Sequence, residues 1–298
     1  MSKSMGYALL AACANVAAAQ NAPPPEIETQ QVAPGIHVLY GAGGNIGVSA
    51  GADGMFLIDD QYAAVTPKVM EALAKLHPQP PRFVLNTHWH GDHTGGNENL
   101  AEKGAVIVAH DQVRVRMSTE QFSAFSKRKT PASPAKALPV VTFSDSLSLH
   151  VNGDELRGIY VPHAHTDGDV LIHFKKANVI HTGDLMFAGM YPFIDIDTGG
   201  SVIGLIAAVD KIIGLADDST RVIPGHGKVT DRAGLVAYRE MLAVTSRRMQ
   251  DLVRAGKTVD EALAMKPNAD YDATLSWDFI TAERYVRILH RDATNALR

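Results

Sequence analysis

Four of six consecutive residues in one short segment carry side chains that bind metal ions. His88, His90, Asp92 and His93 follow an apolar run that ends at Asn86. Residues two apart in an extended segment project to the same side, so His88 and His90 can reach one ion. Asp92 and His93 come after a glycine and can turn toward a second ion. In a chain of ordinary composition, this density of imidazole and carboxylate groups predicts a metal site.

Three later motifs carry further histidines and an aspartate, each at the expected end of a strand. Either His163 or His165 can act as a ligand in the first of them, and Asp184 and His226 belong to the other two. Loops at strand ends are where layered α/β enzymes commonly build their sites. The three motifs are P-H-A-H-T-D-G-D at 162–169, H-T-G-D at 181–184 and P-G-H-G at 224–227.

The overall composition restricts the other possibilities. The 298 residues include thirteen histidines and one cysteine, which excludes an intramolecular disulfide and a zinc site built from several thiolates. The formal net charge of −4 gives no general attraction to nucleic acid. The predicted partner is therefore a small-molecule substrate and not a nucleic acid, while the oligomeric state stays open.

Apolar periodicity predicts strands and helices that alternate along the chain. Short apolar runs between glycine-rich turns predict strands, and apolar residues at helical spacing predict helices. Strands are expected over 36–40, 46–50, 55–59, 82–86, 105–109, 170–174, 178–182 and 221–223, with an antiparallel set within 140–161. Helices are expected over 66–77, 95–102, 201–215, 233–253, 262–265 and 281–297. The pattern indicates an α/β (α+β) layered fold with two sheets inside and helices outside.

The first 32 residues are predicted to lie outside the folded domain. Residues 1–19 resemble a secretory signal peptide, because one lysine precedes an uncharged run that ends in three alanines. A lipoprotein signal acylated at Cys13 and a disordered alanine-rich tail are the alternatives. Residues 20–32 contain three prolines and are predicted to be a linker, and residues 33–298 a single domain. The predicted location is periplasmic or secreted, with no transmembrane span, since the apolar run is too short to cross a bilayer.

The motifs in their order, H-x-H-x-D-H, a histidine before T-x-G, T-G-D and G-H-G, resemble the metallo-β-lactamase-fold hydrolases. The resemblance extends over about residues 35–250 and includes N-I-G-V-S at 45–49 and L-I-D-D at 57–60. It implies a four-layer αββα sandwich with a metal pair at one edge of the sheets. It also implies His165 rather than His163 as the ligand, because His165 stands directly before Thr166-x-Gly168.

By this resemblance, seven residues bind two zinc ions. The first ion has His88, His90 and His165, the second has Asp92, His93 and His226, and Asp184 bridges both. Neutral imidazoles suit zinc, and two carboxylates offset the formal +4 of the metal pair. A hydroxide held between two ions is a nucleophile at neutral pH, and Asp92 is the catalytic residue expected to orient it.

The predicted activity is that of a binuclear zinc hydrolase that uses a metal-bound hydroxide to open a small amide, lactone or ester, with a β-lactam or lactone ring as candidates. Some β-lactamases of the family have a cysteine where this chain has Asp184, so its ligand set is that of the general hydrolases. A glyoxalase II-like thioester hydrolase and a mononuclear iron persulfide dioxygenase, with Fe in place of zinc, are the alternatives. The intact ligand set disfavours a noncatalytic periplasmic accessory protein.

Three other segments are predicted to support the site. Residues 118–139 show neither the apolar spacing of a helix nor that of a strand, and they are expected to form a surface insertion or a lid. The glycine-rich hairpin 41–45 is expected to be a mobile flap. Asp59 or Asp60, at a strand end, is expected either to hold a ligand histidine from behind or to form an ordinary turn. The residues predicted to contact the substrate are Phe187, Met190, Tyr191 and Phe193.

Overall fold

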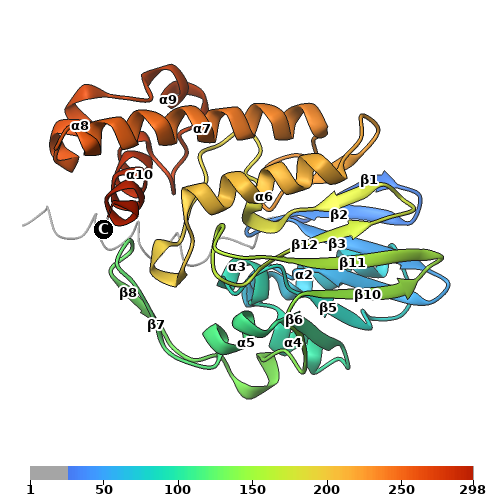
Figure 1. Cartoon of the computed structure of the whole chain (residues 1–298). Helices are drawn as coiled ribbons and strands as arrows, with labels where there is room; N and C mark the ends of the chain where they lie inside the picture. Colours follow the sequence, from blue (N-terminus) through green and yellow to red (C-terminus); the bar gives the residue numbers. More distant parts are fainter. Residues whose placement is uncertain (1–25, 298) are drawn as a thin grey trace, which may run out of the picture.

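Two β-sheets pack face to face, with helices on both outer sides (Figure 1). The computed structural model describes residues 26–297. Helices α6 to α10 lie on one side of the sheets, and α2, α4 and α5 lie on the other. The predicted four-layer αββα sandwich is therefore confirmed, and the predicted signal peptide and Cys13 lie outside the described residues.

The first sheet contains seven strands in the order β1-β2-β3-β4-β5-β6-β9. Strands β1 to β4 pair antiparallel, whereas β4, β5, β6 and β9 pair parallel. Parallel neighbours end at the same edge of a sheet, so the loops that follow β4 and β5 lie side by side. The strands are β1 Glu28–Ala33, β2 Ile36–Tyr40, β3 Ile46–Gly51, β4 Gly54–Ile58, β5 Phe83–Leu85, β6 Val106–His110 and β9 Val141–Phe143.

The second sheet contains five strands in the order β10-β11-β12-β13-β14, antiparallel except for the last pair. The turn between β10 and β11 uses Asn152 and Gly153, whose φ angles of 54° and 73° are those of a tight hairpin turn. The antiparallel set expected in 140–161 is confirmed for residues 146–161, whereas residues 141–143 form β9, which pairs parallel with β6 in the first sheet. The strands are β10 Ser146–Val151, β11 Asp154–Val161, β12 Asp169–Phe174, β13 Val179–His181 and β14 Arg221–Ile223.

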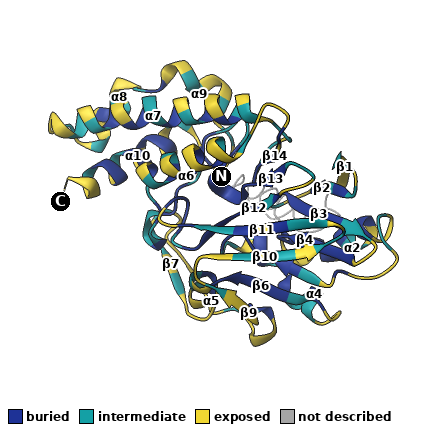
Figure 2. Ribbon diagram, turned by 45° about the vertical axis from the view of Figure 1, so that its right-hand side comes forward, coloured by how far each residue is buried: buried dark blue, intermediate teal, exposed yellow. Residues whose placement is uncertain are grey.

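Most helices bury one face and expose the other, as the dark and yellow stripes in Figure 2 show, although α9 contains no fully buried residue. Polar side chains cap the N-termini of several helices. Ser201 caps α6 through a hydrogen bond from the Gly204 amide, and Thr258 forms the predicted capping box of α8 with Glu261. The helices are α2 Thr66–Ala74, α3 Gly91–Thr94, α4 Asn97–Ala101, α5 Asp111–Met117, α6 Val202–Leu215, α7 Arg232–Arg254, α8 Val259–Met265, α9 Ala269–Leu275 and α10 Ala282–Ala296.

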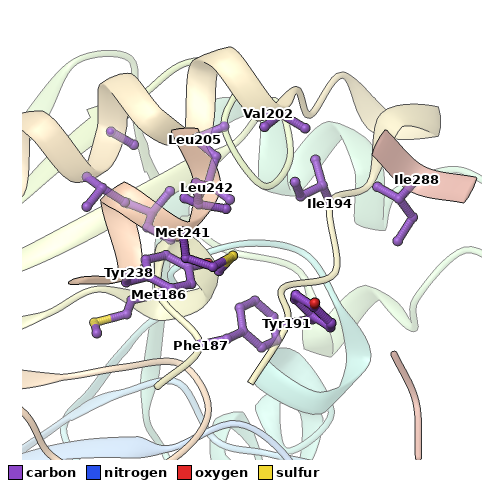
Figure 3. Packing of buried hydrophobic residues seen from close by; sticks show 14 of the residues in the cluster. Met186, Phe187, Tyr191, Ile194, Val202, Leu205, Tyr238, Met241, Leu242 and Ile288 are labelled. Atoms are coloured by element: carbon purple, nitrogen blue, oxygen red, sulfur yellow. The ribbon is translucent and has the colours of Figure 1, made fainter. Parts of the chain in front are cut away.

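Among the described residues, three large apolar cores and a smaller one around Val113 and Met117 hold the layers together. One lies between the sheets and includes Val38 and Ile58 of the first sheet and Ile172 of the second. Another joins α2 and α4 to the outer face of the first sheet. The largest joins α6, α7 and α10 to the second sheet, and Figure 3 shows Leu205 and Leu242 meeting within it. Each sheet face is thus covered, as an αββα sandwich requires.

The start of the domain corrects the linker prediction. Residues 28–32 of the expected linker belong to β1, which pairs antiparallel with β2 along its length. An edge strand needs only one covered face, so β1 can be polar, and its sequence shows no apolar alternation that would have predicted a strand. The insertion at 118–139 contains a small hairpin of β7 Gln121–Ser123 and β8 Arg128–Thr130. Among residues 26–297, no helix is long and apolar enough to cross a membrane.

The largest core generates a stability prediction on one helix. Leu205 of α6 is fully buried, so Leu205→Ala should lower the free energy of unfolding by about 2–5 kcal/mol through lost burial and a cavity. Ile203 on the same helix is 56% exposed, and Ile203→Ala should change it by only about 0.5 kcal/mol. Urea denaturation of both variants measures the difference, and equal effects would contradict the burial described for α6.

Candidate metal centre

Loops from both sheets bring the seven predicted ligands to one edge of the sandwich. The loop after β5 carries His88 and His90 into the short helix α3, which holds Asp92 and His93. The loop before β12 supplies His165. The remaining two follow β13 and β14, which are parallel neighbours and end together. They are Asp184 and His226.

The first group of side chains contains three imidazoles and one carboxylate. One potential ligand atom from each of His88, His90, His165 and Asp184 lies within 4.8 Å of the others. His165 Nε2 is 2.9 Å from His90 Nδ1 and 3.4 Å from Asp184 Oδ2. His88 Nε2 is 3.7 Å from the same carboxylate oxygen. These spacings suit atoms that share one ion.

The second group contains Asp92, His93 and His226, whose potential ligand atoms also lie within 4.8 Å of one another. Asp92 Oδ2 is 3.5 Å from His93 Nε2 and 3.2 Å from His226 Nε2. Asp184 Oδ1 is 3.1 Å from His93 Nε2 and 3.4 Å from His226 Nε2. The two oxygens of Asp184 therefore face different groups, one oxygen to each.

Hydrogen bonding shows that acceptor atoms face one another across the centre. His165 Nδ1 donates to the Phe193 carbonyl at 2.8 Å, and His90 Nε2 donates to Asp195 Oδ2 at 2.9 Å. If both rings are neutral, His165 Nε2 and His90 Nδ1, which lie 2.9 Å apart, each carry a lone pair and no proton. His93 donates from Nδ1 to Asp59, so in its neutral form, which metal binding requires, its Nε2 lone pair faces a carboxylate oxygen. Facing acceptors repel unless a cation lies among them.

Buried atoms without hydrogen-bond partners support the same conclusion. Among the described residues, His88 Nε2, His93 Nε2 and Asp184 Oδ1 are buried and make no hydrogen bond. A buried polar atom without a partner is costly, and metal coordination removes that cost. The donor set therefore fits divalent metal.

The charge state of the centre also suits a cation. Burial holds the pKa of His88 well below its usual value and lowers the pKa of His165 to about 4, so both rings are neutral, as ligands must be. Burial alone would raise the pKa of Asp184, but the surrounding histidines, His93 foremost, hold it well below its usual value. Burial alone would lower the pKa values of His93 and His226, but Asp184 raises the first well above its usual value and the second to about 9. An ionised carboxylate thus lies among two neutral rings and two histidines that it draws toward the charged form.

Asp59 holds His93 from behind, which confirms one of the two alternatives for this strand end. Its Oδ2 accepts from His93 Nδ1 at 2.8 Å, and its two oxygens also accept from the amide and the hydroxyl of Thr87 at 2.7 Å each. Asp59 has a φ of 63°, an uncommon conformation for a residue other than glycine. Its neighbour Asp60 accepts from the Gly96 amide at 2.9 Å and fixes the end of the ligand loop.

The hairpin 41–45 is hydrogen-bonded to the ligand loops, which argues against the predicted mobile flap. The Gly44 amide donates to the Asp92 carbonyl at 3.0 Å. Asn45 Nδ2 donates to the carbonyls of Pro224 and Gly227, on both sides of His226, at 2.8 Å each. Gly44 also lies so close to the His93 ring that a Cβ would collide with it. The segment therefore fixes the loop that carries Asp92 and His93 relative to the loop that carries His226.

A cavity of about 410 Å³ opens onto the centre. Phe187 and Phe193, two of the predicted substrate contacts, line it, and Phe187 stacks on His226 at 5.0 Å between ring centroids. The predicted ligands His90, Asp92, Asp184 and His226 also line it, whereas sequence reasoning missed the other aromatic residues of the wall, because no motif marks them. Those residues include Tyr62, Trp277 and Phe279.

Met190 and Tyr191 do not line this cavity, which corrects their prediction as substrate contacts. Tyr191 is fully buried, stacks on Tyr285 at 4.0 Å between ring centroids, and donates to Asp272 at 2.8 Å. Figure 3 shows it within the largest apolar core. Met190 packs against the same core. Neighbouring residues in an irregular segment point in different directions, so proximity to Asp184 in sequence did not place their side chains.

Comparison with known proteins identifies the family. The sequence profile of the metallo-beta-lactamase superfamily matches residues 39–226, which include all seven residues of the centre. The chain belongs to the metallo-beta-lactamase superfamily. Its relatives in this superfamily are metal-dependent hydrolases, and this chain is a hydrolase of that kind with a His/Asp cluster suited to divalent metal.

Individual superfamily members differ in activity and in how much of the chain they match. The metallo-beta-lactamase type 2 of Bacteroides fragilis is 26% identical over 188 residues, or 59% of this chain and 69% of that protein. The hydroxyacylglutathione hydrolase of Erythrobacter litoralis is 30% identical over 141 residues, 45% of this chain and about half (48%) of that protein.

Solved structures of the superfamily share the fold at low identity. The DIM-1 metallo-beta-lactamase aligns with a TM-score of 0.59 and 18% identity, over 74% of this chain and 98% of that one. The sec-alkylsulfatase Pisa1 from Pseudomonas sp. aligns with a TM-score of 0.67 and 18% identity, over 89% of this chain and 50% of that one. At these identities the likeness establishes the architecture alone.

The two histidines of the second motif should differ in their effect on metal binding. His165 is fully buried against Asp184, whereas His163 is exposed, has a φ of 53°, and contacts the Gly199 carbonyl. His165→Ala should weaken zinc binding at least roughly tenfold, and His163→Ala should leave it unchanged. Metal content after dialysis against graded zinc measures both. Loss of metal in the His163 variant alone would overturn the placement of His165.

Asp195 was not predicted from the sequence, and it should act through His90. Removing its charge in Asp195→Asn weakens the hydrogen bond that orients the ring, so zinc affinity should fall roughly tenfold while the apo protein stays folded. Asp197→Asn, in the same segment but bonded to Arg291, is the matched control. Competition with a chromogenic chelator gives both affinities, and equal values for the two variants would count against this role.

Proposed function

We propose that this protein is a binuclear zinc hydrolase that opens a small amide, lactone or ester. One observation carries the proposal: Asp184 presents Oδ2 to His165 at 3.4 Å and Oδ1 to His93 at 3.1 Å. A single carboxylate placed between two donor groups suits two ions rather than one. The five imidazoles and two carboxylates favour zinc, and the chain's only cysteine, Cys13, is far from these motifs in sequence.

The residues of the proposed centre have distinct roles. His88, His90 and His165 would hold one ion and Asp92, His93 and His226 the other, with Asp184 shared. When bound, zinc supplies Lewis acidity and lowers the pKa of water, which makes hydrolysis possible at neutral pH.

Asp92 is the residue proposed to handle the proton of the attacking water. It is partly exposed, at 22% of its side chain, and lines the cavity, so its carboxylate can reach both the centre and the substrate. As an acceptor at that place it orients the water and receives its proton. Phe187 and Phe193 form the apolar wall that positions the rest of the substrate and excludes bulk water.

A thioester hydrolase is the second candidate. The relative that is 30% identical carries the name hydroxyacylglutathione hydrolase, and its match covers 45% of this chain. An iron-containing dioxygenase has the same donor types but one ion, so metal analysis separates it from both hydrolases. Export to the periplasm or the medium belongs to the proposal too, although the segment that predicts it lies outside residues 26–297.

Substitution of Asp92 tests the mechanism. Asp92→Asn keeps the size of the side chain but removes the acceptor charge, so kcat should fall at least roughly 100-fold at saturating zinc. A panel of β-lactam, lactone, ester and thioester substrates identifies the reaction to follow. Chelation with EDTA should abolish turnover, and zinc should restore it.

Metal counting completes this test. Protein purified without added metal should contain about two zinc ions per chain rather than about one iron. Near-normal turnover of a fully metal-loaded Asp92→Asn variant would exclude the proton-handling role. A chain with one iron and no hydrolysis of any substrate in the panel would exclude the proposed function itself.

A further inference from the structure

A second cavity, of about 500 Å³, adjoins the one that opens onto the metal centre. Phe193 lines both cavities. The second cavity lies among the hairpin β7–β8, the segment around Ile196 and helix α10. Figure 1 shows this hairpin extending from the sandwich toward α10. Each volume is within the range of about 300–1,000 Å³ that small-molecule sites occupy.

Aromatic rings connect the two cavities without a break. The His90 ring is 5.8 Å from Phe193, which is 4.9 Å from Phe125 of the hairpin and 5.5 Å from Phe279. Trp277 continues the series, 5.6 Å from Phe279. The outermost ring, Phe279, is 42% exposed. A continuous aromatic surface that is partly open to solvent favours an apolar ligand along it.

The far end of this surface carries positive charge without a carboxylate partner. Arg287 pairs with Glu283 at 2.9 Å, and Arg291 pairs with Asp197. Arg284 lies 5.7 Å from the Phe125 ring centroid and donates only to the backbone carbonyls of residues 278 and 279. Among residues 26–297, no carboxylate lies within 4.0 Å of it. Lys127, which also lines the cavity, adds a second cation.

The acidic residues of the cavity are already engaged, so they do not cancel that charge. Asp195 accepts from His90 at 2.9 Å, and Glu283 accepts from Arg287. Asp197 accepts from Arg291 and, at 2.7 Å, from the Ala124 amide, which fastens the hairpin to α10. Arg284 is therefore available to an anionic group of a ligand.

We propose that the two cavities form one binding site for an elongated substrate with an apolar body and an anionic end. The bond to be hydrolysed lies at the His/Asp centre, the body lies against Phe193 and Phe279, and a terminal carboxylate pairs with Arg284. This proposal rests on the proposed hydrolase function and names the substrate class of that site. It assigns specificity to the β7–β8 hairpin and α10.

Two matched esters test the proposal on the full-length, zinc-loaded protein. One is the mono-4-nitrophenyl ester of linear octanedioic acid, and the other is the same ester with its free carboxylate converted to the amide. The charged ester should have a kcat/KM roughly tenfold higher than that of the neutral ester. The difference should come from a lower KM, because one charge-assisted contact is gained. Arg284→Gln should remove this preference, so that the kcat/KM values of the two esters become roughly equal. Arg247→Gln, which removes an exposed arginine from α7, is the control that should keep it.

Two further measurements complement these rates. The salt dependence needs no variant, and ligand binding needs no turnover. The preference of the wild-type enzyme should fall at 0.5 M salt, where an exposed ion pair is screened. Quenching of tryptophan fluorescence by 8-(4-nitrophenoxy)octanoate and by its amide, both unreactive ethers, gives the two dissociation constants directly. Arg284→Gln should raise the constant of the carboxylate alone, again roughly tenfold.

The outcomes separate this proposal from the proposed function. If both esters are hydrolysed at equal rates and Arg284→Gln changes neither rate, the anion site is excluded while the hydrolase function stands. If neither ester is hydrolysed but the ether carboxylate binds in an Arg284-dependent manner, the anion site stands and the ester-hydrolase function does not. Equal binding of the two ethers by the wild-type protein also overturns the proposal.

Discussion

The structure depends on a centre in which acceptor atoms face one another. His90 Nδ1 lies 2.9 Å from His165 Nε2, and His93 Nε2 lies 3.1 Å from Asp184 Oδ1. A protein ordinarily separates such atoms or places a donor between them. Here the donors are on the far side of each ring, where Asp195, Asp59 and a backbone carbonyl fix the outward N–H groups. The outer hydrogen bonds thereby determine which nitrogen faces inward.

The sandwich supplies the rigidity that this arrangement requires. Four loops from two sheets converge, and their backbones are bonded directly to one another: the Asn45 amide donates to the Gly225 carbonyl at 2.7 Å, and the Gly225 amide donates to the Gly183 carbonyl at 2.7 Å. A Cβ on Gly225 would collide with Asp184, so a side chain there would separate the loops. The hydrogen bonds of the hairpin 41–45 contribute to the same rigidity, since a flexible segment at this place would release the ligand loops.

Local patterns in the sequence predicted most strands and helices and the four ligands of the first motif, and the family resemblance implied the rest of the centre, whereas long-range contacts escaped both. His88, His90, Asp92 and His93 are close in sequence, so their spacing alone indicates a shared function. Asp195 bonds to His90 from 105 positions away, and no local pattern marks it. Tyr191 and Phe193 are two positions apart and aromatic, yet one enters the core and the other lines the cavity. Burial at such positions is decided by packing against distant helices, which apolar periodicity does not describe.

In the proposed function, part of the substrate wall comes from residues beyond the segment that carries the ligands. The match to the superfamily ends at residue 226, and all seven residues of the centre lie within it. Trp277, Phe279 and Arg284 come later, yet they line the cavity of the centre or the one beside it. The relatives named as a metallo-beta-lactamase and as a hydroxyacylglutathione hydrolase match 59% and 45% of this chain, so neither name decides the substrate of this enzyme. In the binding site proposed above, the aromatic surface and the arginine beyond it would supply that information, because those side chains meet whatever extends away from the reacting bond.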